Sequence, residues 1–220
     1  MKKFETNAIR TQSERTENRE HSVPLYLTSS FTFEDAEQMR AMFADELEGN
    51  IYSRFSNPNA TEFVEKMCQM EGAEDGYATA SGMSAIFASF MALLKSGDHI
   101  LSASSIFGST HTVLTKFLPK WGITHSYADM NKPETWEALI NKNTKMIFVE
   151  TPSNPGLDII DLEWLGNLAN KHNIILNVDN CFATPFLQQP IKYGAHLVTH
   201  SEKKVKNRGA MTIFLKPTFL

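Results

Sequence analysis

The sequence predicts a three-layer α/β/α fold, in which helices cover both faces of a mostly parallel sheet. From residue 61 onward, short apolar segments typical of strands alternate with segments whose apolar residues recur at helical spacing. A helix between successive strands is the connection that joins parallel strands by a right-handed crossover. The length also fits, since 220 residues with 42% hydrophobic content can bury one sizeable core.

The expected elements follow from the apolar residues and from the positions of Gly and Pro. In chain order they are a helix over 61–70, a strand over 76–80, a helix that opens after Ser81 and Gly82, a strand over 100–103, a helix over 110–118, a strand over 123–127, a helix over 133–140, a strand over 145–150, a helix striped by Leu162, Leu165 and Leu168, a strand over 174–178 and an apolar segment over 195–200. Pro133 is expected to open its helix, and Pro119 to stop the one before it.

Three regions differ in character. Residues 1–60 are polar and irregular, with one short helix expected near 33–43, and are typical of an extended arm. Such an arm needs a surface to lie on, and a second subunit is a natural candidate. Residues 61–201 carry the regular α/β pattern. Residues 202–220 are rich in Lys and Arg, and we interpret them as a divergent, solvated tail.

Composition narrows the possible classes of function. The net charge of −4 gives no indication of a nucleic-acid partner or of a basic membrane-binding face. The two cysteines, Cys68 and Cys181, are too few for a disulfide framework, and their spacing suits no metal site. No leader-like or membrane-spanning apolar stretch is found in the sequence, so a cytoplasmic protein without a membrane partner is expected.

Residues that directly follow strands are the first candidates for ligand binding, because ligands bind at the carboxyl ends of strands in such sheets. Ser81 and Gly82 open a helix whose free N–H groups suit a phosphate, although an ordinary turn has the same pattern. Phe107 suits the face of a planar ring but also suits a core position. Asn154 lies between two prolines and offers an amide, or else forms an Asx turn. Asp179 closes a buried strand, where it either meets a cation or caps the next helix.

Asp179 and Lys204 together favour one cofactor. A carboxylate at the end of a buried strand is costly unless it meets a cation, and a pyridinium nitrogen is one such cation. Lys204 follows the next apolar segment, where an amine can hold the same ring as a Schiff base. The sequence therefore predicts a pyridoxal 5'-phosphate (PLP) site. A nicotinamide site is disfavoured because no strand is followed by a G-x-G-x-x-G turn.

Five motifs resemble those of the Cys/Met-metabolism family of PLP enzymes, which includes cystathionine γ-synthase, the γ-lyases and the O-acylhomoserine sulfhydrylases. The motifs are YSRFSNP at 52–58, ASGMSA at 80–85, ETPSNP at 150–155, VDNCFATP at 178–185 and QQP at 188–190. FGST at 107–110 and the Asp-Asn-Cys form of the aspartate motif most resemble the O-succinylhomoserine sulfhydrylase branch. The resemblance implies the large domain of fold type I of PLP-dependent transferases.

The resemblance also implies roles for individual residues. Phosphate binding falls to the turn Ser81, Gly82 and Met83, to Ser201, and to Tyr52 and Arg54 acting on a neighbouring subunit of a homo-oligomer. Phe107 stacks on the ring, Asn154 binds its phenolic oxygen, and Asp179 keeps its nitrogen protonated. The family motif His-Ser-Ala-Thr-Lys corresponds to HSEKK at 200–204, so Lys204 is the Schiff-base lysine. Lys204 and Phe107 are the expected catalytic residues, and no metal is expected.

The implied reaction is γ-replacement on O-succinyl- or O-acetylhomoserine by sulfide or a thiol, in methionine biosynthesis or transsulfuration. After Ser201 the sequence departs from the family: Glu202 and Lys203 replace Ala and Thr, and the family's Gly-rich continuation and C-terminal domain are not expected here. Two alternatives follow, a truncated remnant without turnover and a PLP-dependent C–S γ-lyase.

Overall fold

The computed structural model describes residues 3–10, 15–201 and 211–215. The chain divides into two compact units, one up to Lys66 and one from Met67 onward. The first unit contains α1 (Phe4–Arg10), α2 (Ala36–Phe43) and most of α3 (Pro58–Glu71), which ends in the second unit. Helix α2 was expected from the sequence and α1 was not. Position 60, the expected end of the arm, falls within α3.

The second unit is built on a seven-stranded sheet in the order β1-β7-β6-β5-β4-β2-β3. The strands are β1 (Asp75–Thr79), β2 (His99–Ala103), β3 (Thr124–Ala128), β4 (Thr144–Glu150), β5 (Ile175–Asp179), β6 (Leu197–Thr199) and β7 (Met211–Leu215). The pairs β2–β3, β2–β4, β4–β5 and β5–β6 are parallel, whereas β7 is antiparallel to both β1 and β6. The predicted, mostly parallel sheet is therefore confirmed.

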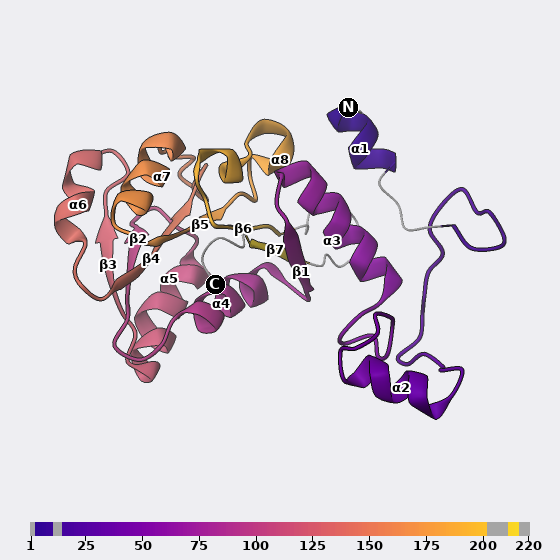
Figure 1. The fold of residues 1–220 in the computed structure, drawn as a ribbon. Coiled ribbons are helices and arrows are strands. Elements are labelled where there is room, and N and C mark those ends of the chain that lie inside the picture. The colour runs from indigo at the N-terminus through magenta and orange to yellow at the C-terminus, as the bar shows by residue number, and fades with distance from the viewer. Residues whose placement is uncertain (1–2, 11–14, 202–210, 216–220) are drawn as a thin grey trace. The chain divides into compact units, whose positions relative to one another are not determined.

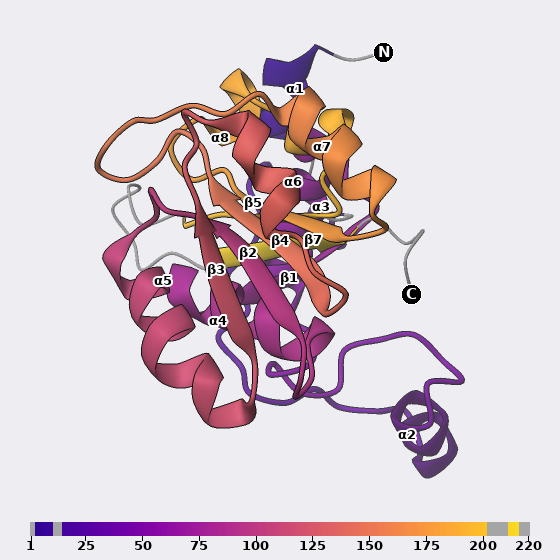
Figure 2. The same cartoon turned by 90° about the vertical axis from the view of Figure 1, so that its left-hand side faces the viewer.

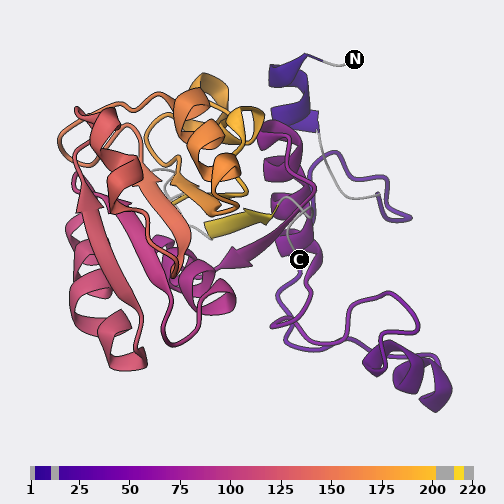
Figure 3. The same cartoon turned by 60° about the vertical axis from the view of Figure 1, so that its left-hand side comes forward.

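Helices cover both faces of this sheet. Figures 1 and 2 show α4 and α5 on one face and α6, α7 and α8 on the other, and Figure 3 shows the same layers from between these views. The bounds are α4 (Gly82–Leu93), α5 (Gly108–Thr112), α6 (Trp136–Leu139), α7 (Leu162–Lys171) and α8 (Thr184–Leu187). Shorter turns are the π-helical η1 (Val113–Phe117) and the 3₁₀ helices η2 (Leu118–Trp121), η3 (Pro133–Thr135) and η4 (Pro190–Tyr193). No helix of the described residues has the length and apolar character needed to cross a membrane.

The core between α4, α5 and the sheet rests on aromatic and branched side chains. Phe90 of α4 meets Phe148 of β4 edge to face, with the ring centroids 5.2 Å apart. Both are fully buried, as are Ile100 and Leu114 in the same cluster. Such aromatic pairs contribute about 0.5–1.5 kcal/mol beyond the area they bury. This packing makes the sheet a rigid base for the loops at its edge.

Two local expectations are corrected by the structure. The helical path does not stop at Pro119, because η2 begins at Leu118 and has this proline in its first turn, where the missing N–H costs nothing. It ends instead at Gly122, whose φ of +72° is favourable only for glycine. The residues of β7 lie in the segment interpreted as a solvated tail, yet they pair between β1 and β6. Their sequence, MTIFL, is rich in strand-forming residues.

Candidate functional site

The carboxyl ends of the strands meet at one edge of the sheet in the second unit. Strands β1 and β6 are both antiparallel to β7, so β1 has the same direction as β6 and as the parallel strands beyond it. Ser81 follows β1, Phe107 lies in the connection after β2, Asn154 in the one after β4, and Ser201 follows β6. Asp179 is the last residue of β5. The topology therefore brings these five predicted residues to one edge.

Two carboxyl groups lie side by side at the centre of this edge. Glu150, the last residue of β4, pairs in register with Asp179, and each is only 5% exposed. Oε2 of Glu150 accepts a hydrogen bond of 2.7 Å from the backbone N–H of Phe107. Oδ1 of Asp179 accepts one of 3.0 Å from the backbone N–H of Cys181. The connections after β2, β4 and β5 are thus tied together around two acids.

The surroundings of the two acids stabilise a negative charge to different extents. Burial and then the charge of Asp179 raise the pKa of Glu150 to about 8, and the amide of Phe107 opposes them only in part. Burial also raises the pKa of Asp179, but the hydrogen bonds from Cys181 and the positive charge of His200 work against it. The larger set of stabilising partners thus surrounds Asp179, whereas burial and the charge of Asp179 hold Glu150 protonated at neutral pH.

Helix α4 begins at this edge with an ordinary cap. The Ser81 side chain accepts a hydrogen bond of 3.2 Å from the N–H of Ser84. The N–H groups of Gly82 and Met83 in the same first turn have no intrahelical acceptor, because an α-helix offers none to its first amides. A helix of 12 residues directs its positive dipole end and these amides toward the sheet edge, which suits an anion.

Further predicted residues of the second unit are placed as follows. Phe107 is 41% exposed, so it is not part of the core. The backbone N–H of Ser201 bonds the Cys181 thiol, whose pKa is raised by burial and then by the charge of Asp179. Asp179 caps no helix, since α8 begins only at Thr184. Within the described residues, Asn154 forms no hydrogen bond to another candidate residue, and its role stays a prediction.

Two further predicted residues belong to the first unit, and one is outside the described residues. Tyr52 and Arg54 belong to the first unit, where the Arg54 guanidinium lies over the rings of Tyr52 and Phe55, 5.4 and 4.9 Å from the centroids. Lys204 lies outside the described residues. The residues described at the sheet edge therefore do not include the lysine.

Two groups of residues were missed by sequence reasoning. Glu150 ends a buried strand as Asp179 does, so the same signal could have found it. Glu71 and His200 form a buried pair, with 2.5 Å between Oε1 and Nε2. No local pattern indicates this pair, because its members are 129 residues apart in the sequence.

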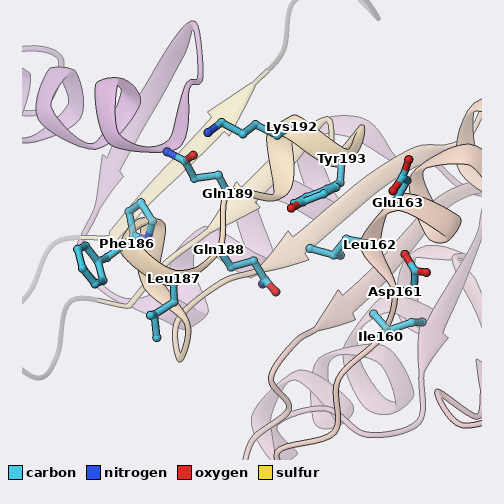
Figure 4. A pocket seen from close by; sticks show the side chains of 11 residues that line it. Ile160, Asp161, Leu162, Glu163, Phe186, Leu187, Gln188, Gln189, Lys192 and Tyr193 are labelled. Atoms are coloured by element: carbon cyan, nitrogen blue, oxygen red, sulfur yellow. The ribbon is translucent and has the colours of Figure 1, made fainter. Parts of the chain in front are cut away.

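A separate cavity of about 390 Å³ opens beside α7 and α8 (Figure 4). It is lined by Ile160, Asp161, Leu162, Glu163, Pro185, Phe186, Leu187, Gln188, Gln189, Lys192 and Tyr193. None of these is a predicted site residue. Among the described residues, no group of three or more His, Cys, Asp and Glu side chains is arranged to hold a metal ion.

Comparison with known proteins decides the family. The model of the Cys/Met metabolism PLP-dependent enzyme family matches residues 5–207. The chain belongs to this family. It is 46% identical over 201 residues to an O-succinylhomoserine sulfhydrylase of Pseudomonas aeruginosa, covering 91% of this chain and 50% of that protein. It is 38% identical over 187 residues to an L-methionine gamma-lyase of Porphyromonas gingivalis, covering 84% of this chain and 47% of the relative.

A solved structure confirms the fold. A protein of Campylobacter jejuni, described as an O-acetylhomoserine (thiol)-lyase, superposes with a TM-score of 0.93 at 34% identity, covering 98% of this chain and 55% of that one. That crystal structure contains a pyridoxyl-lysine phosphate group. The chain spans about half the length of the relatives it matches.

The side chains of this chain fit the cofactor that defines the family. Within the described residues, no Lys or Arg forms an ion pair with the buried Asp179 carboxylate. A cationic ligand group can therefore bind this carboxylate directly. The free amides of the α4 N-terminus supply the donors for a phosphate. Phe107, whose side chain is exposed, donates its backbone N–H to Glu150, one of the paired acids. A phosphorylated pyridinium ring presents a cation, an anion and an aromatic face, and these three features of the chain match them in turn.

Proposed function

We propose that this chain is the cofactor-binding part of a PLP-dependent enzyme that carries out γ-replacement on O-succinyl- or O-acetylhomoserine, with sulfide or a thiol as the second substrate. The observation that carries the proposal is the buried Asp179 carboxyl group, which lies in register with Glu150 and has no Lys or Arg partner in the described residues. The similarity to O-succinylhomoserine sulfhydrylases supports the choice of substrate class.

In this proposal each residue at the sheet edge has one task. Asp179 holds the ring nitrogen in its protonated form, which a charge-assisted hydrogen bond stabilises. The amides of Gly82 and Met83 bind the phosphate, and the hydroxyl groups of Ser81 and Ser201 add donors. Phe107 covers the ring. By resemblance, Asn154 binds the phenolic oxygen, and Tyr52 and Arg54 bind the phosphate held by a neighbouring subunit.

Lys204 carries the cofactor and moves protons. When bound, the protonated ring supplies an electron sink for bond breaking at the substrate's α-carbon. The free amine of Lys204 would take the substrate's α-proton and then help to move a β-proton. An amine can accept a proton only when neutral, so the site must favour the uncharged form of this lysine.

A γ-lyase is the second candidate, because methionine γ-lyases are also among the similar proteins, at 38–40% identity. The two reactions are told apart by their products. Replacement on O-succinylhomoserine with sulfide gives homocysteine, whereas elimination from L-methionine gives methanethiol, ammonia and a 2-oxo acid. Measuring both sets of products with the same protein preparation decides between them.

Borohydride reduction with peptide mapping tests cofactor attachment. The chain is incubated with PLP, reduced and digested, and the labelled lysine is identified by mass spectrometry. We expect the label on Lys204, and we expect it to be lost in Lys204→Ala but kept in the matched variant Lys203→Ala. A label on Lys203, or one scattered over surface lysines, contradicts the assignment.

A further inference from the structure

A buried acid–imidazole pair lies behind the strand ends of the second unit. Glu71, the last residue of α3, has a fully buried side chain, and the His200 side chain is 2% exposed. Nε2 of His200 lies 2.5 Å from Oε1 of Glu71. The same oxygen accepts a hydrogen bond of 2.8 Å from the side-chain amide of Asn180. Glu71 is therefore held by two residues that directly follow the sheet strands β5 and β6.

Burying such a pair costs more than filling the space with apolar side chains of similar volume. The cost is visible here, since Oε2 of Glu71 is buried and finds no hydrogen-bond partner among the described residues. A buried pair of this kind is weak evidence for stability, whereas the short contact between Glu71 and His200 fixes the place of the imidazole ring.

His200 directly follows β6, the strand whose last residue pairs with Asp179. Asp179 pairs in register with Thr199, and the backbone N–H of Asn180 donates to the carbonyl of Thr199 at 2.9 Å. Asn180 and His200, which contact Glu71, thus directly follow Asp179 and Thr199 in the chain. The positive charge of His200 lowers the pKa of Asp179.

Within the part of the chain that the structure describes, the other titratable groups that act on Asp179 supply no positive charge. Glu150 opposes its ionisation as a second acid. The pKa of the Cys181 thiol is raised by burial and by Asp179 itself, so this group stays neutral. Of these neighbours, His200 is the one that brings a positive charge to Asp179.

We propose that Glu71 and His200 are positioning residues for Asp179: Glu71 holds the His200 ring charged and oriented, and the charged ring keeps Asp179 ionised to receive the ring nitrogen of the cofactor. The first half of this statement concerns the chain alone, and the second half rests on the proposed function. Glu71→Gln removes the carboxylate of the pair and His200→Gln removes its imidazole, and each keeps a hydrogen-bonding side chain of similar size.

The first test needs no cofactor. The titration of the Asp179 carboxyl carbon is followed by ¹³C NMR in the chain, with Asp179→Asn used for assignment. We expect its midpoint to rise by about one pH unit in Glu71→Gln and in His200→Gln, the scale expected for one neighbouring charge. The matched control is His196→Gln, because His196 is a similarly buried histidine (4% exposed) just before β6. Unchanged midpoints in both pair variants overturn the proposal.

The second test separates charge from structure in cofactor binding. PLP is compared with its analogue in which the ring nitrogen is replaced by C–H, by equilibrium titration of each into every variant. Loss of the pair should weaken PLP by about tenfold and leave the carbon analogue within about twofold, since only PLP offers Asp179 a cation. Equal losses for both ligands mean a structural role and refute the proposal. If the wild-type chain binds neither ligand, the proposed function fails, and the NMR titration still decides the role of the pair.

Discussion

Glu150→Gln should make the chain more stable at high pH. Glu150 has a pKa raised from 4.5 to about 8 by burial and by Asp179. A carboxyl group with a raised pKa in the folded state contributes stability that is fully present below its unfolded pKa, near 4.5. This contribution is lost as the pH rises through about 8. Glutamine never ionises, and its side-chain oxygen can still accept the hydrogen bond from Phe107.

The magnitude follows from the two pKa values. The span from 4.5 to about 8 corresponds to a ceiling of about 5 kcal/mol, at about 1.4 kcal/mol per pKa unit. Because an effective dielectric constant near 20 applies even to buried sites in proteins, about 2–3 kcal/mol is the realistic part. We expect Glu150→Gln and wild type to unfold with similar free energies at pH 5, and the variant to be about 2–3 kcal/mol more stable at pH 9.

Urea denaturation at pH 5, 7 and 9, without cofactor, measures this difference. The matched control is Glu137→Gln. Glu137 is a surface acid whose pKa is lowered by Lys171 and then by His172, so its replacement gives no gain at high pH. Parallel stability profiles of wild type and Glu150→Gln between pH 5 and 9 would refute the reasoning, since they would show that Glu150 ionises without penalty.

Three further variants test the site and the fold. Asp179→Asn should weaken PLP by about 1.5–3 kcal/mol in a direct titration, because a charged partner becomes neutral, and equal affinities would contradict its pairing with the ring. Gly166→Ala should lower the free energy of unfolding by about 1–3 kcal/mol, because a Cβ there overlaps the backbone oxygen of Tyr193, and an unchanged urea midpoint would count against that packing. Asp161→Ala should cost about 1 kcal/mol of stability, because its side chain accepts the Trp164 N–H at 3.0 Å to cap α7, and no loss would mean that water replaces the cap.

Much of the fold was predictable because its strands are short apolar runs between helix-forming segments. The expected strand over 174–178 corresponds to β5 (Ile175–Asp179), and the one over 145–150 corresponds to β4. Strand β7 was not predicted, because its position between β1 and β6 depends on pairing across the whole sheet and no local pattern encodes it.

The residues of the candidate site likewise divide into those with a local sequence signal and those without one. Asp179 was found because a lone acid closes an apolar run, and this signal is local. The partners that set its charge were not found, since Glu150 meets it only through sheet register and Glu71 reaches His200 across 129 residues of sequence. Sequence reasoning thus located the group that would meet the cofactor and missed the groups that tune it.

Under the proposed assignments, the charges of the described residues at the sheet edge balance that of one protonated ring. Glu150 is neutral at pH 7 because its pKa is raised to about 8. Glu71 and His200 cancel each other as an ion pair, which leaves the single negative charge of Asp179. One protonated ring nitrogen neutralises that charge. If either Glu150 were ionised or His200 neutral, the edge would hold an excess negative charge that one ring could not balance, and the buried acids would take up a proton instead.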